Sequence, residues 1–249
     1  MRLKKPLKHT GRPYVITVNF NKITIKPGFK ILDIGCGPGR HVSAFYSHEN
    51  VTAIGADLSL NDLKEGVKRL QFHDQLGAHC GGTWAFTTAD ITCLPFKDDY
   101  FDIVICSEVM EHIPDEEKAA KEILRVLKPG HDLVVSVPRF WPERICWALS
   151  DVYFNANQGH IRIYKKKPLV QLIENAGATY RTAHHAHSLH SPYWWLKCFV
   201  GPSREDSFAV NLYKRFLTWD ILQKPWITRS LDKILNPLMG KSLVLYFKK

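Results

Sequence analysis

The stretch ILDIGCGPGRH, residues 31–41, decides the fold of this chain. Four residues typical of a buried strand lead into a loop with glycine at every second position, and a helix-like segment follows. Glycine backbone lets a ligand approach closely, and the first turn of a helix offers unpaired N–H groups. We therefore expect a ligand to lie on this loop, at the end of a strand.

Short apolar runs alternate with longer amphipathic segments from residue 30 onward. The runs are KILDIG (30–35), VTAIGA (51–56), TWAFTTAD (83–90), FDIVICS (101–107) and DLVVSVP (132–138). Residues 115–128 predict a helix with one apolar face and with Gly130 as its stop. This alternation is typical of parallel strands linked by helices, and it indicates an α/β fold with a doubly wound, Rossmann-like sheet.

The chain divides into four predicted parts. Residues 1–29 form a basic N-terminal segment, and residues 30–187 form the core, with an insertion at about 139–164 where the periodic pattern loosens. Residues 188–240 mix aromatic side chains with charges and predict an α-helical, aromatic-rich cap. Residues 241–249 predict the last core strand.

Composition limits the class of protein. The 249 residues are 45% hydrophobic and 23% charged, which suits one sizeable globular domain. No apolar run reaches the ~18 residues that a membrane-spanning helix needs, so we expect a cytoplasmic protein. The six cysteines are scattered without a CxxC pair, which indicates neither a zinc site nor a disulfide framework.

The formal charge of +10 is concentrated at the N-terminus. Residues 1–30 contain eight lysines and arginines and no acid, which leaves only +2 for the remainder (10 − 8). Such an arm is typical of contact with nucleic-acid phosphates or with anionic lipid at a membrane surface. The simpler interpretation, which we favour, is a solvated terminus.

The spacing of the glycines argues against a dinucleotide ligand. A dinucleotide loop has the pattern G-x-G-x-x-G, whereas here the glycines are Gly35, Gly37 and Gly39, and Arg40 stands where the third glycine belongs. Asp33 also places a carboxylate beside the loop. This charge suits the cationic part of S-adenosylmethionine better than it suits a pyrophosphate.

Two further acids follow predicted strands. Asp57, 22 residues after Gly35 (57 − 35), stands where a doubly wound fold places the acid that binds a ribose. Asp90 ends the next strand, where its carboxylate can accept the adenine amino group while Ile91 packs on the ring. Each acid alone is a weak signal, because a strand-end Asp often caps a helix, but the order and spacing of all these features favour the cofactor.

The motifs ILDIGCGPGRH, GADLS, TADITCLPF, FDIVICSEVMEHI and RVLKPG resemble those of class I S-adenosylmethionine-dependent methyltransferases, particularly the ubiquinone and menaquinone biosynthesis type. The resemblance covers residues 28–138 and implies a seven-stranded sheet with a reversed last strand. His131 departs from the family pattern, which usually has a second glycine after Gly130. The resemblance implies that the cofactor contacts Asp33, Gly35, Cys36, Gly37, Gly39, Asp57, Leu58, Asp90, Ile91 and Ser107.

Candidate catalytic residues follow the fourth predicted strand. His112, with Glu111 beside it, is a candidate general base for the proton of the acceptor, and a purely structural role is the equal alternative. The E-x-x-E-H spacing also resembles that of metal-dependent O-methyltransferases of the ubiquinone type and of small-RNA 3′-terminal methyltransferases. That second resemblance implies a divalent cation such as Mg²⁺ on Glu108, Glu111, His112 and His160.

The second half of the chain offers candidate acceptor-binding residues. These are His160, His190, Tyr193 and Trp194. Residues 184–190 contain four histidines that do not share one face at strand spacing, so we favour packed or exposed histidines over a metal site. The aromatic stretch 193–226 can roof an apolar acceptor pocket, anchor the protein at a membrane interface, or simply form the core of the cap.

The sequence therefore predicts a methyltransferase acting on a small or lipid-like molecule, with oxygen favoured over carbon as the acceptor atom. The first alternative is an RNA methyltransferase, which the basic arm and the E-x-x-E-H resemblance support. The second is a scaffold that binds the cofactor without catalysis. The identity of the acceptor and the oligomeric state stay open.

Overall fold

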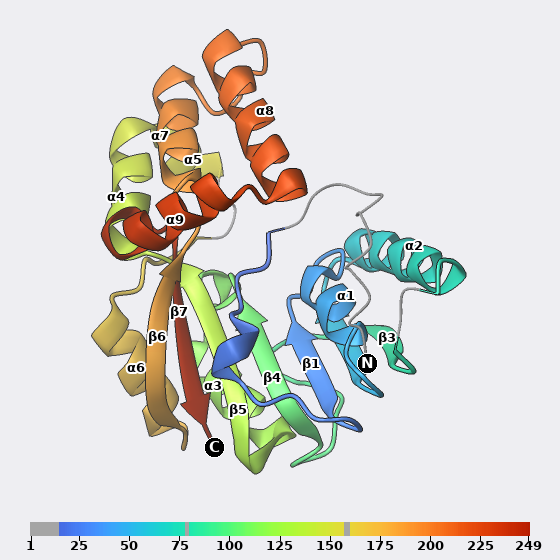
Figure 1. Cartoon of the computed structure of the whole chain (residues 1–249). Helices are drawn as coiled ribbons and strands as arrows, with labels where there is room; N and C mark the ends of the chain where they lie inside the picture. Colours follow the sequence, from blue (N-terminus) through green and yellow to red (C-terminus); the bar gives the residue numbers. More distant parts are fainter. Residues whose placement is uncertain (1–14, 78–79, 157–159) are drawn as a thin grey trace.

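The computed structural model describes residues 15–77, 80–156 and 160–249, and its centre is a seven-stranded sheet (Figure 1). The strand order is β3-β2-β1-β4-β5-β7-β6, and β7 is antiparallel to both of its neighbours. This confirms the doubly wound sheet with a reversed last strand. The strands are β1 (Lys30–Ile34), β2 (Thr52–Asp57), β3 (Thr83–Thr88), β4 (Phe101–Ser107), β5 (Leu127–Pro138), β6 (Thr179–Ala186) and β7 (Ser242–Lys248).

Helices cover both faces of the sheet, because the central strands are apolar on both sides and need two layers to bury them. On one face, α1 (Arg40–Tyr46) and α2 (Leu60–Gln75) pack with the short 3-10 helix η1 (Phe20–Lys22). On the other face, α3 (Glu116–Val126) and α6 (Lys166–Asn175) pack against the sheet. All seven residues of β4 are buried between these layers.

The helix expected at 115–128 is shorter than its pattern suggested. Asp115 is the N-cap, and its side chain accepts a hydrogen bond from the Lys118 N–H. The helix ends at Val126, and Leu127 already pairs with Phe101 in the sheet, so Gly130 is not the residue that stops the helix. Strand pairing therefore ends this helix before its glycine is reached.

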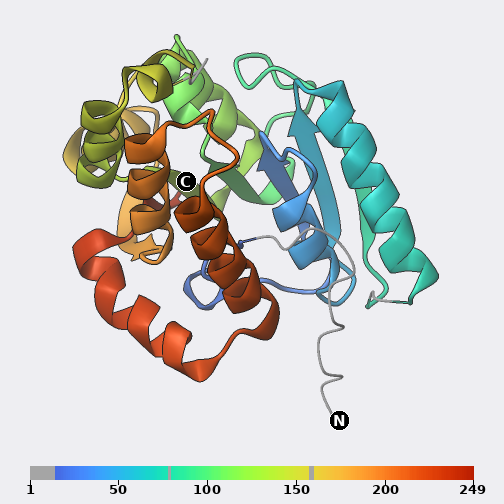
Figure 2. The same cartoon turned by 90° about the horizontal axis from the view of Figure 1, so that it is seen from above.

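Five further helices gather at the carboxyl edge of the sheet (Figure 1). Seen from above, they lie over one half of that edge, while α1 and α2 lie beside the other half (Figure 2). The helices are α4 (Phe140–Leu149), α5 (Asp151–Ala156), α7 (His190–Val200), α8 (Phe208–Gln223) and α9 (Trp226–Met239). The division into core, insertion and cap stays a prediction.

Within residues 15–77, 80–156 and 160–249, no helix combines the length and the apolarity that crossing a membrane requires. Residues 1–14 of the predicted basic segment lie outside the described residues.

Candidate functional site

The glycine loop connects β1 to α1 and has left-handed backbone at each of its three glycines, with φ of 64° at Gly35, 50° at Gly37 and 75° at Gly39. A Cβ at Gly35 would clash with Val109 Cγ2, and one at Gly39 would lie 2.7 Å from the ring of Phe86. A Cβ at Gly37 would meet nothing within 4 Å. Two of the glycines are therefore required by packing, and Gly37 alone faces open space where a ligand can approach.

Asp57 ties the glycine loop to the end of β2. Its Oδ2 accepts a hydrogen bond from the Gly37 N–H at 2.7 Å, and its Oδ1 accepts one from the Ser59 N–H at 2.8 Å. Each carboxylate oxygen can accept a second hydrogen bond, so Asp57 can still bind a ribose. Leu58 is 66% exposed beside it and offers an apolar surface.

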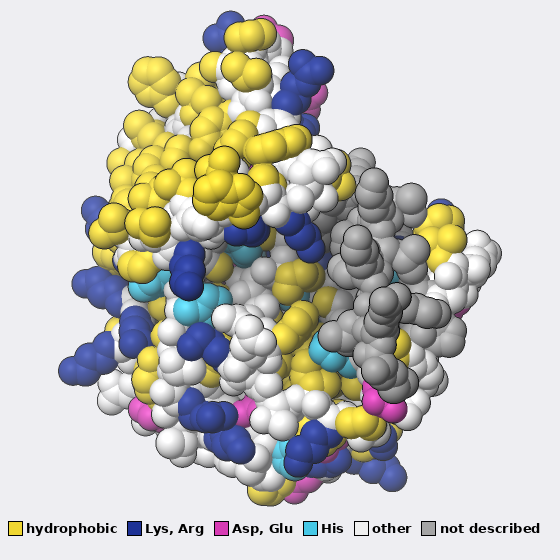
Figure 3. All heavy atoms as spheres, viewed as in Figure 1, with side chains coloured by type: hydrophobic (Ala, Val, Ile, Leu, Met, Phe, Trp, Pro, Cys, Tyr) yellow, Lys and Arg dark blue, Asp and Glu magenta, His cyan; other side chains and the backbone are white. Residues whose placement is uncertain are grey.

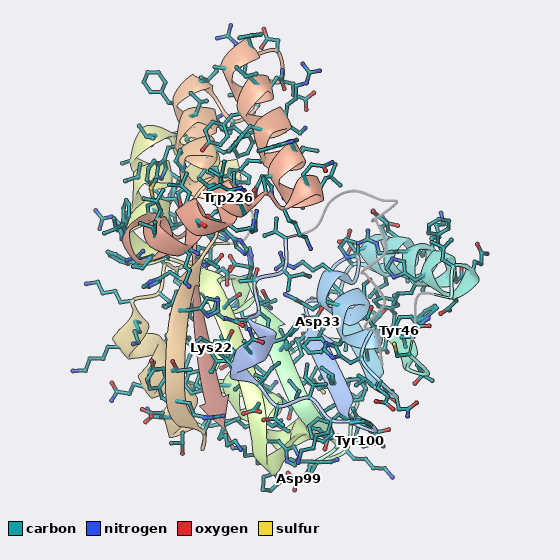
Figure 4. All side chains as sticks on the ribbon, in the orientation of Figure 1. Lys22, Asp33, Tyr46, Asp99, Tyr100 and Trp226 are labelled. Carbon is teal, nitrogen blue, oxygen red and sulfur yellow. The ribbon has the colours of Figure 1, made fainter. Side chains whose placement is uncertain are left out.

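Asp33 is a buried acid near the tip of β1 (Figure 4). His41 Nδ1 lies 3.4 Å from Asp33 Oδ1, yet neither carboxylate oxygen accepts a hydrogen bond from the described residues. The next loop residue, Cys36, is also buried, and burial followed by the charges of Asp33 and Asp57 raises the pKa of its thiol. A buried carboxylate with unused acceptors beside the loop suits a cationic ligand.

Asp90 and Ile91 lie at the end of β3 in different environments. Asp90 is exposed, and hydrogen bonds from the backbone and hydroxyl of Thr92 lower its pKa. Ile91 is only 4% exposed and belongs to the core on the α3 side of the sheet. Contact of its side chain with an adenine ring stays a prediction, and Leu58 is the more open apolar side chain.

Ser107 ends β4 in a buried polar contact. Its Oγ lies 2.8 Å from Ser136 Oγ and accepts a hydrogen bond from Arg40 Nη2 at 3.1 Å. Arg40 Nη1 also donates to the backbone oxygen of Val15 at 3.5 Å. The guanidinium therefore spans the glycine loop, β4 and the N-terminal segment, and sequence reasoning treated Arg40 only as a missing glycine.

Three of the four predicted metal ligands come together. Glu111 and His112 lie on the 3-10 helix η2 (Met110–His112), and the Ile161 N–H donates to the Glu111 backbone oxygen at 3.1 Å, which brings His160 alongside. One ligand atom from each of Glu111, His112 and His160 lies within 4.8 Å of the others.

Glu108 does not join this group, contrary to the E-x-x-E-H expectation. Its backbone has φ of 59°, so the helical turn that would align it with Glu111 does not form. Its Oε1 instead accepts a hydrogen bond from Ser136 Oγ at 3.2 Å.

Glu143 completes the group, although the sequence did not mark it. This acid on α4 is 2% exposed, and its Oε1 lies 3.0 Å from His160 Nδ1 and accepts a hydrogen bond from the Tyr153 hydroxyl at 3.2 Å. Burial alone would raise the pKa of Glu143, but the His160 hydrogen bond and the charge of Lys241 outweigh it and hold the pKa below its usual value. An ionised carboxylate only accepts, so His160 Nδ1 donates the hydrogen bond to Glu143.

Glu111 is a buried acid with unused hydrogen-bonding capacity. Burial, followed by the negative charge of Glu108, raises its pKa well above the usual value. Neither of its carboxylate oxygens accepts a hydrogen bond from the described part of the chain, and its Oε1 lies 3.9 Å from His160 Nε2 and 4.0 Å from His112 Nε2. A buried carboxyl group without hydrogen-bond donors is either protonated or binds a cation.

The predicted acceptor-binding residues separate into two neighbourhoods. The Trp194 ring lies 5.9 Å from the ring of Tyr153, and Lys241 Nζ lies 5.0 Å above it, so Trp194 adjoins the Glu143 group. The ring of Tyr193 contacts those of Trp194 and Tyr213. His190 instead contacts the ring of His187, on the side of the N-terminal segment.

The four histidines of residues 184–190 do not converge on one point, although the rings of His187 and His190 contact each other. His184 stacks on Tyr246, and His187 Nε2 lies 3.3 Å from Thr17 Oγ1. Among the residues that the structure describes, Glu111, His112 and His160 form the one group of three or more histidines, cysteines or acids placed to share a metal ion.

Residues 32–135 match the sequence family described as a methyltransferase domain. This part of the chain is therefore similar to methyltransferase domains. The domain contains the glycine loop, the strand-end acids and the Glu111–His112 pair. Glu143, His160 and Trp194 lie beyond it, in segments that the family match does not reach.

Curated relatives support the same assignment. The methyltransferase GfsG of Streptomyces halstedii is 31% identical over 120 residues, which cover 47% of this chain and 40% of that protein. Cycloartenol-C-24-methyltransferase 1 of Oryza sativa subsp. japonica is 33% identical over 145 residues (57% and 37%). Demethylmenaquinone methyltransferase of Renibacterium salmoninarum is 36% identical over 121 residues (47% and 46%). The match spans less than half of the length of each of these relatives.

Solved structures extend the likeness of the fold beyond the methyltransferase domain. The YcgJ protein of Bacillus subtilis superposes with a TM-score of 0.60 at 17% identity, covering 92% of this chain and 95% of that one. The MccD protein superposes with a TM-score of 0.57 at 17% identity (92% and 94%). At this identity the likeness shows the fold alone.

Proposed function

We propose that the chain binds S-adenosylmethionine on the glycine loop and transfers its methyl group to a small, lipid-like acceptor. The observation that carries the proposal is the loop itself: Gly37 faces open space, and the buried carboxylate of Asp33 has unused acceptors beside it. Both features fit a ligand that is cationic and lacks phosphate.

Different residues would bind different parts of the cofactor. Asp33, Arg40 and Ser107 would hold the amino-acid part, since Arg40 supplies a guanidinium for a carboxylate and Asp33 a carboxylate for an ammonium or sulfonium. Asp57 would bind the ribose hydroxyls, and Leu58 would pack against the adenine. When bound, the cofactor supplies a methyl group on a cationic sulfur, and the residues around it align the acceptor and exclude water.

The group of Glu111, His112, His160 and Glu143 would handle the proton of an oxygen or carbon acceptor. Glu143 fixes the ring of His160 through Nδ1, and His112, with 39% of its side chain exposed, is the member open to an arriving substrate. We assign His112 as general base, with Glu111 positioning it from the buried side. Oxygen is the acceptor atom that such a base serves most directly.

A divalent cation is a second candidate for the same group. Glu111, His112 and His160 offer one carboxylate and two imidazoles within 4.8 Å of one another, and the buried Glu111 lacks a hydrogen-bond donor from the described residues. A cation held there would supply a Lewis acid for the acceptor oxygen. The donor set, one acid and two histidines, suits a transition metal or Zn²⁺ better than Mg²⁺, which prefers oxygen ligands.

The lipid-like acceptor rests on the composition of the second half of the chain. Tyr153 and Trp194 place aromatic surface beside the Glu143 group, and Tyr193 extends it from Trp194, which favours an apolar acceptor. One relative is named for methylating cycloartenol and another for methylating demethylmenaquinone, which supports the same class of acceptor.

The test is transfer of labelled methyl groups from S-adenosylmethionine to a total lipid extract and, in parallel, to total RNA. We expect label in the organic phase. Label confined to RNA would favour the RNA alternative, and binding of the cofactor without any transfer would favour the scaffold. A chelator arm separates the two assignments of the acid–histidine group, because loss of transfer that Zn²⁺ or Mn²⁺ restores would establish the cation.

A further inference from the structure

Helix α9 has its polar side turned toward the protein. Thr228 is buried, and Asp232 Oδ1 accepts hydrogen bonds from Ser188 Oγ at 2.5 Å and from the Leu189 N–H at 3.2 Å. Asn236 Oδ1 accepts one from the Ser188 N–H at 2.9 Å. Hydrogen bonds from polar side chains therefore fix the orientation of this helix, with its polar side as the inner side.

The outer side of α9 is apolar. Trp226, Ile227, Leu231, Ile234 and Leu238 are all exposed, and Trp226 is 76%, Ile234 68% and Leu238 66% exposed. From Ile227 onward these residues are spaced four, three and four apart, so they form one continuous row on the helix. We call these five residues the α9 stripe. Figure 3 shows apolar side chains gathered over this part of the molecule, and Figure 4 labels Trp226 at the start of the helix.

Basic side chains border the α9 stripe. Lys224, Arg229 and Lys233 line a groove of about 1050 Å³ between α9, β6 and residues 16–21. The acids of residues 208–241 are Asp220 and Asp232, and both are engaged inward, Asp220 with Arg229 and Asp232 with Ser188. Arg229 is offset by Asp220, whereas Lys224 and Lys233 have no acid partner among the described residues, so the unpaired charges beside the stripe are positive.

We propose that the α9 stripe lies in the headgroup region of a bilayer that contains anionic phospholipid. An interfacial helix has an apolar row with tryptophan near its end and basic side chains at its flanks, and α9 has all three. Lys224 and Lys233 would meet lipid phosphates while the stripe enters the acyl boundary.

A second copy of the chain fits this surface less well. A self-complementary interface across the α9 stripe would bring the basic borders of two chains of formal charge +10 together. Docking on a bilayer also explains the position of α9 relative to the site, because Lys241, two residues beyond the helix, lies 3.7 Å from Glu143 Oε2. The inference does not depend on the proposed methyl transfer.

The experiment is vesicle flotation of the whole chain without cofactor, at low and at physiological salt. The probes are vesicles of phosphatidylcholine alone and of phosphatidylcholine with roughly 30% phosphatidylglycerol. We expect binding to the anionic vesicles that weakens with salt. Ile234→Glu and Leu238→Glu should each lower the partition coefficient at least tenfold, which is about 1.4 kcal/mol, and Lys233→Glu should act on anionic vesicles only.

Leu76→Glu is the matched control, since Leu76 is 48% exposed at the end of α2, outside the α9 stripe. It should bind vesicles as the unaltered chain does. All variants should retain the melting temperature and the affinity for S-adenosylhomocysteine of the unaltered chain. The affinity measurement therefore tests the proposed cofactor site independently of vesicle binding. Absence of vesicle binding, equal losses in Leu76→Glu, or a dimer in solution that Ile234→Glu dissociates would overturn the proposal.

Discussion

At the residue scale, the orientation of His160 depends on a single acid. Glu143 accepts from His160 Nδ1 at 3.0 Å, so Glu143→Gln removes the charged acceptor that holds Nδ1 and lets the ring turn or change tautomer. We expect methyl transfer to fall by about 10–100-fold, the usual effect of removing the partner that orients such a histidine. Tyr153→Phe removes a hydroxyl from the same carboxylate and is the matched control. Rates over a range of pH should show a displaced acidic limb in Glu143→Gln only.

Asp57 also has a structural role, which its position at the end of a strand did not predict. Its carboxylate binds the N–H groups of Gly37 and Ser59, so it shapes the glycine loop as well as facing the expected ribose. Asp57→Ala should weaken binding of S-adenosylhomocysteine by roughly 1–3 kcal/mol through lost charged hydrogen bonds. Ser59→Ala, which keeps the acid and removes the N-cap of α2, should lower the melting temperature and leave the affinity nearly unchanged. Equal affinities for the two variants would remove Asp57 from the ribose.

Glu111 makes the folded chain sensitive to alkali. Its pKa is raised by burial, so the protonated acid is favoured in the folded state, and stability falls as the pH rises from the unfolded value of 4.5 through the raised folded pKa. In a metal-free buffer at pH 8, Glu111→Gln should therefore be more stable than the unaltered chain, by about 1–3 kcal/mol. Urea unfolding at pH 5 and pH 8 measures this, and a variant that is less stable at pH 8 would contradict it.

Residues within motifs were predictable, and residues outside them were not. Asp33, Asp57 and the glycines lie at or beside the ends of β1 and β2, so their order in the motifs marks them as candidates. Glu143 and Arg40 carry no such spacing, because one reaches the site from an inserted helix and the other depends on where a long side chain folds back. An acid inside the apolar run FWPERICWAL was the available signal for Glu143.

At the scale of elements, four histidines of β6, the following turn and the start of α7 lie in surroundings that disfavour their charged form. Burial, with smaller contributions from nearby positive groups, lowers the pKa of His184, His185 and His190 to about 4 and lowers that of His187 strongly. These histidines are neutral in the folded state, so their stabilising contribution is present above the unfolded pKa of 6.5 and is lost as the pH falls toward 4.

Part of the loss of stability at acid pH should depend on His184 of β6. His184→Phe preserves the ring that stacks on Tyr246 and removes one titrating group. Between pH 6.5 and pH 4.5, its unfolding free energy should fall less steeply than that of the unaltered chain, by up to about 1.4 kcal/mol per pH unit. Parallel curves for the two proteins would contradict the assignment.

The elements of the core were predictable because their strands are buried on both faces and read as unbroken apolar runs. For helix α3, the sequence predicted the apolar face but not the C-terminal end. The helix ends early because Leu127 pairs with Phe101 in the sheet. Local sequence signals place an element, and its tertiary partners set its boundaries.

At the scale of the whole molecule, the two halves of the chain differ in how much their sequence discloses. The first half builds a sheet edge with a fixed order of motifs, and the structure confirms that order. Beyond residue 138, the spacing of apolar residues reveals an apolar row on α9. This periodicity does not say whether the row faces the protein or the solvent. Hydrogen bonds of Asp232 and Asn236 to residues 188–189 decide that question here.

The central claim, that the glycine loop binds the cofactor, is tested most directly by calorimetric titration with S-adenosylhomocysteine of the unaltered chain, Gly37→Ala and Gly130→Ala. Both glycines have left-handed backbone and open space at Cβ, so both variants should lose about 1 kcal/mol of stability, but only Gly37 lies on the loop. We predict micromolar binding by the unaltered chain and by Gly130→Ala, and at least tenfold weaker binding by Gly37→Ala. Absence of binding by the unaltered chain, or equal binding by Gly37→Ala, would contradict the account.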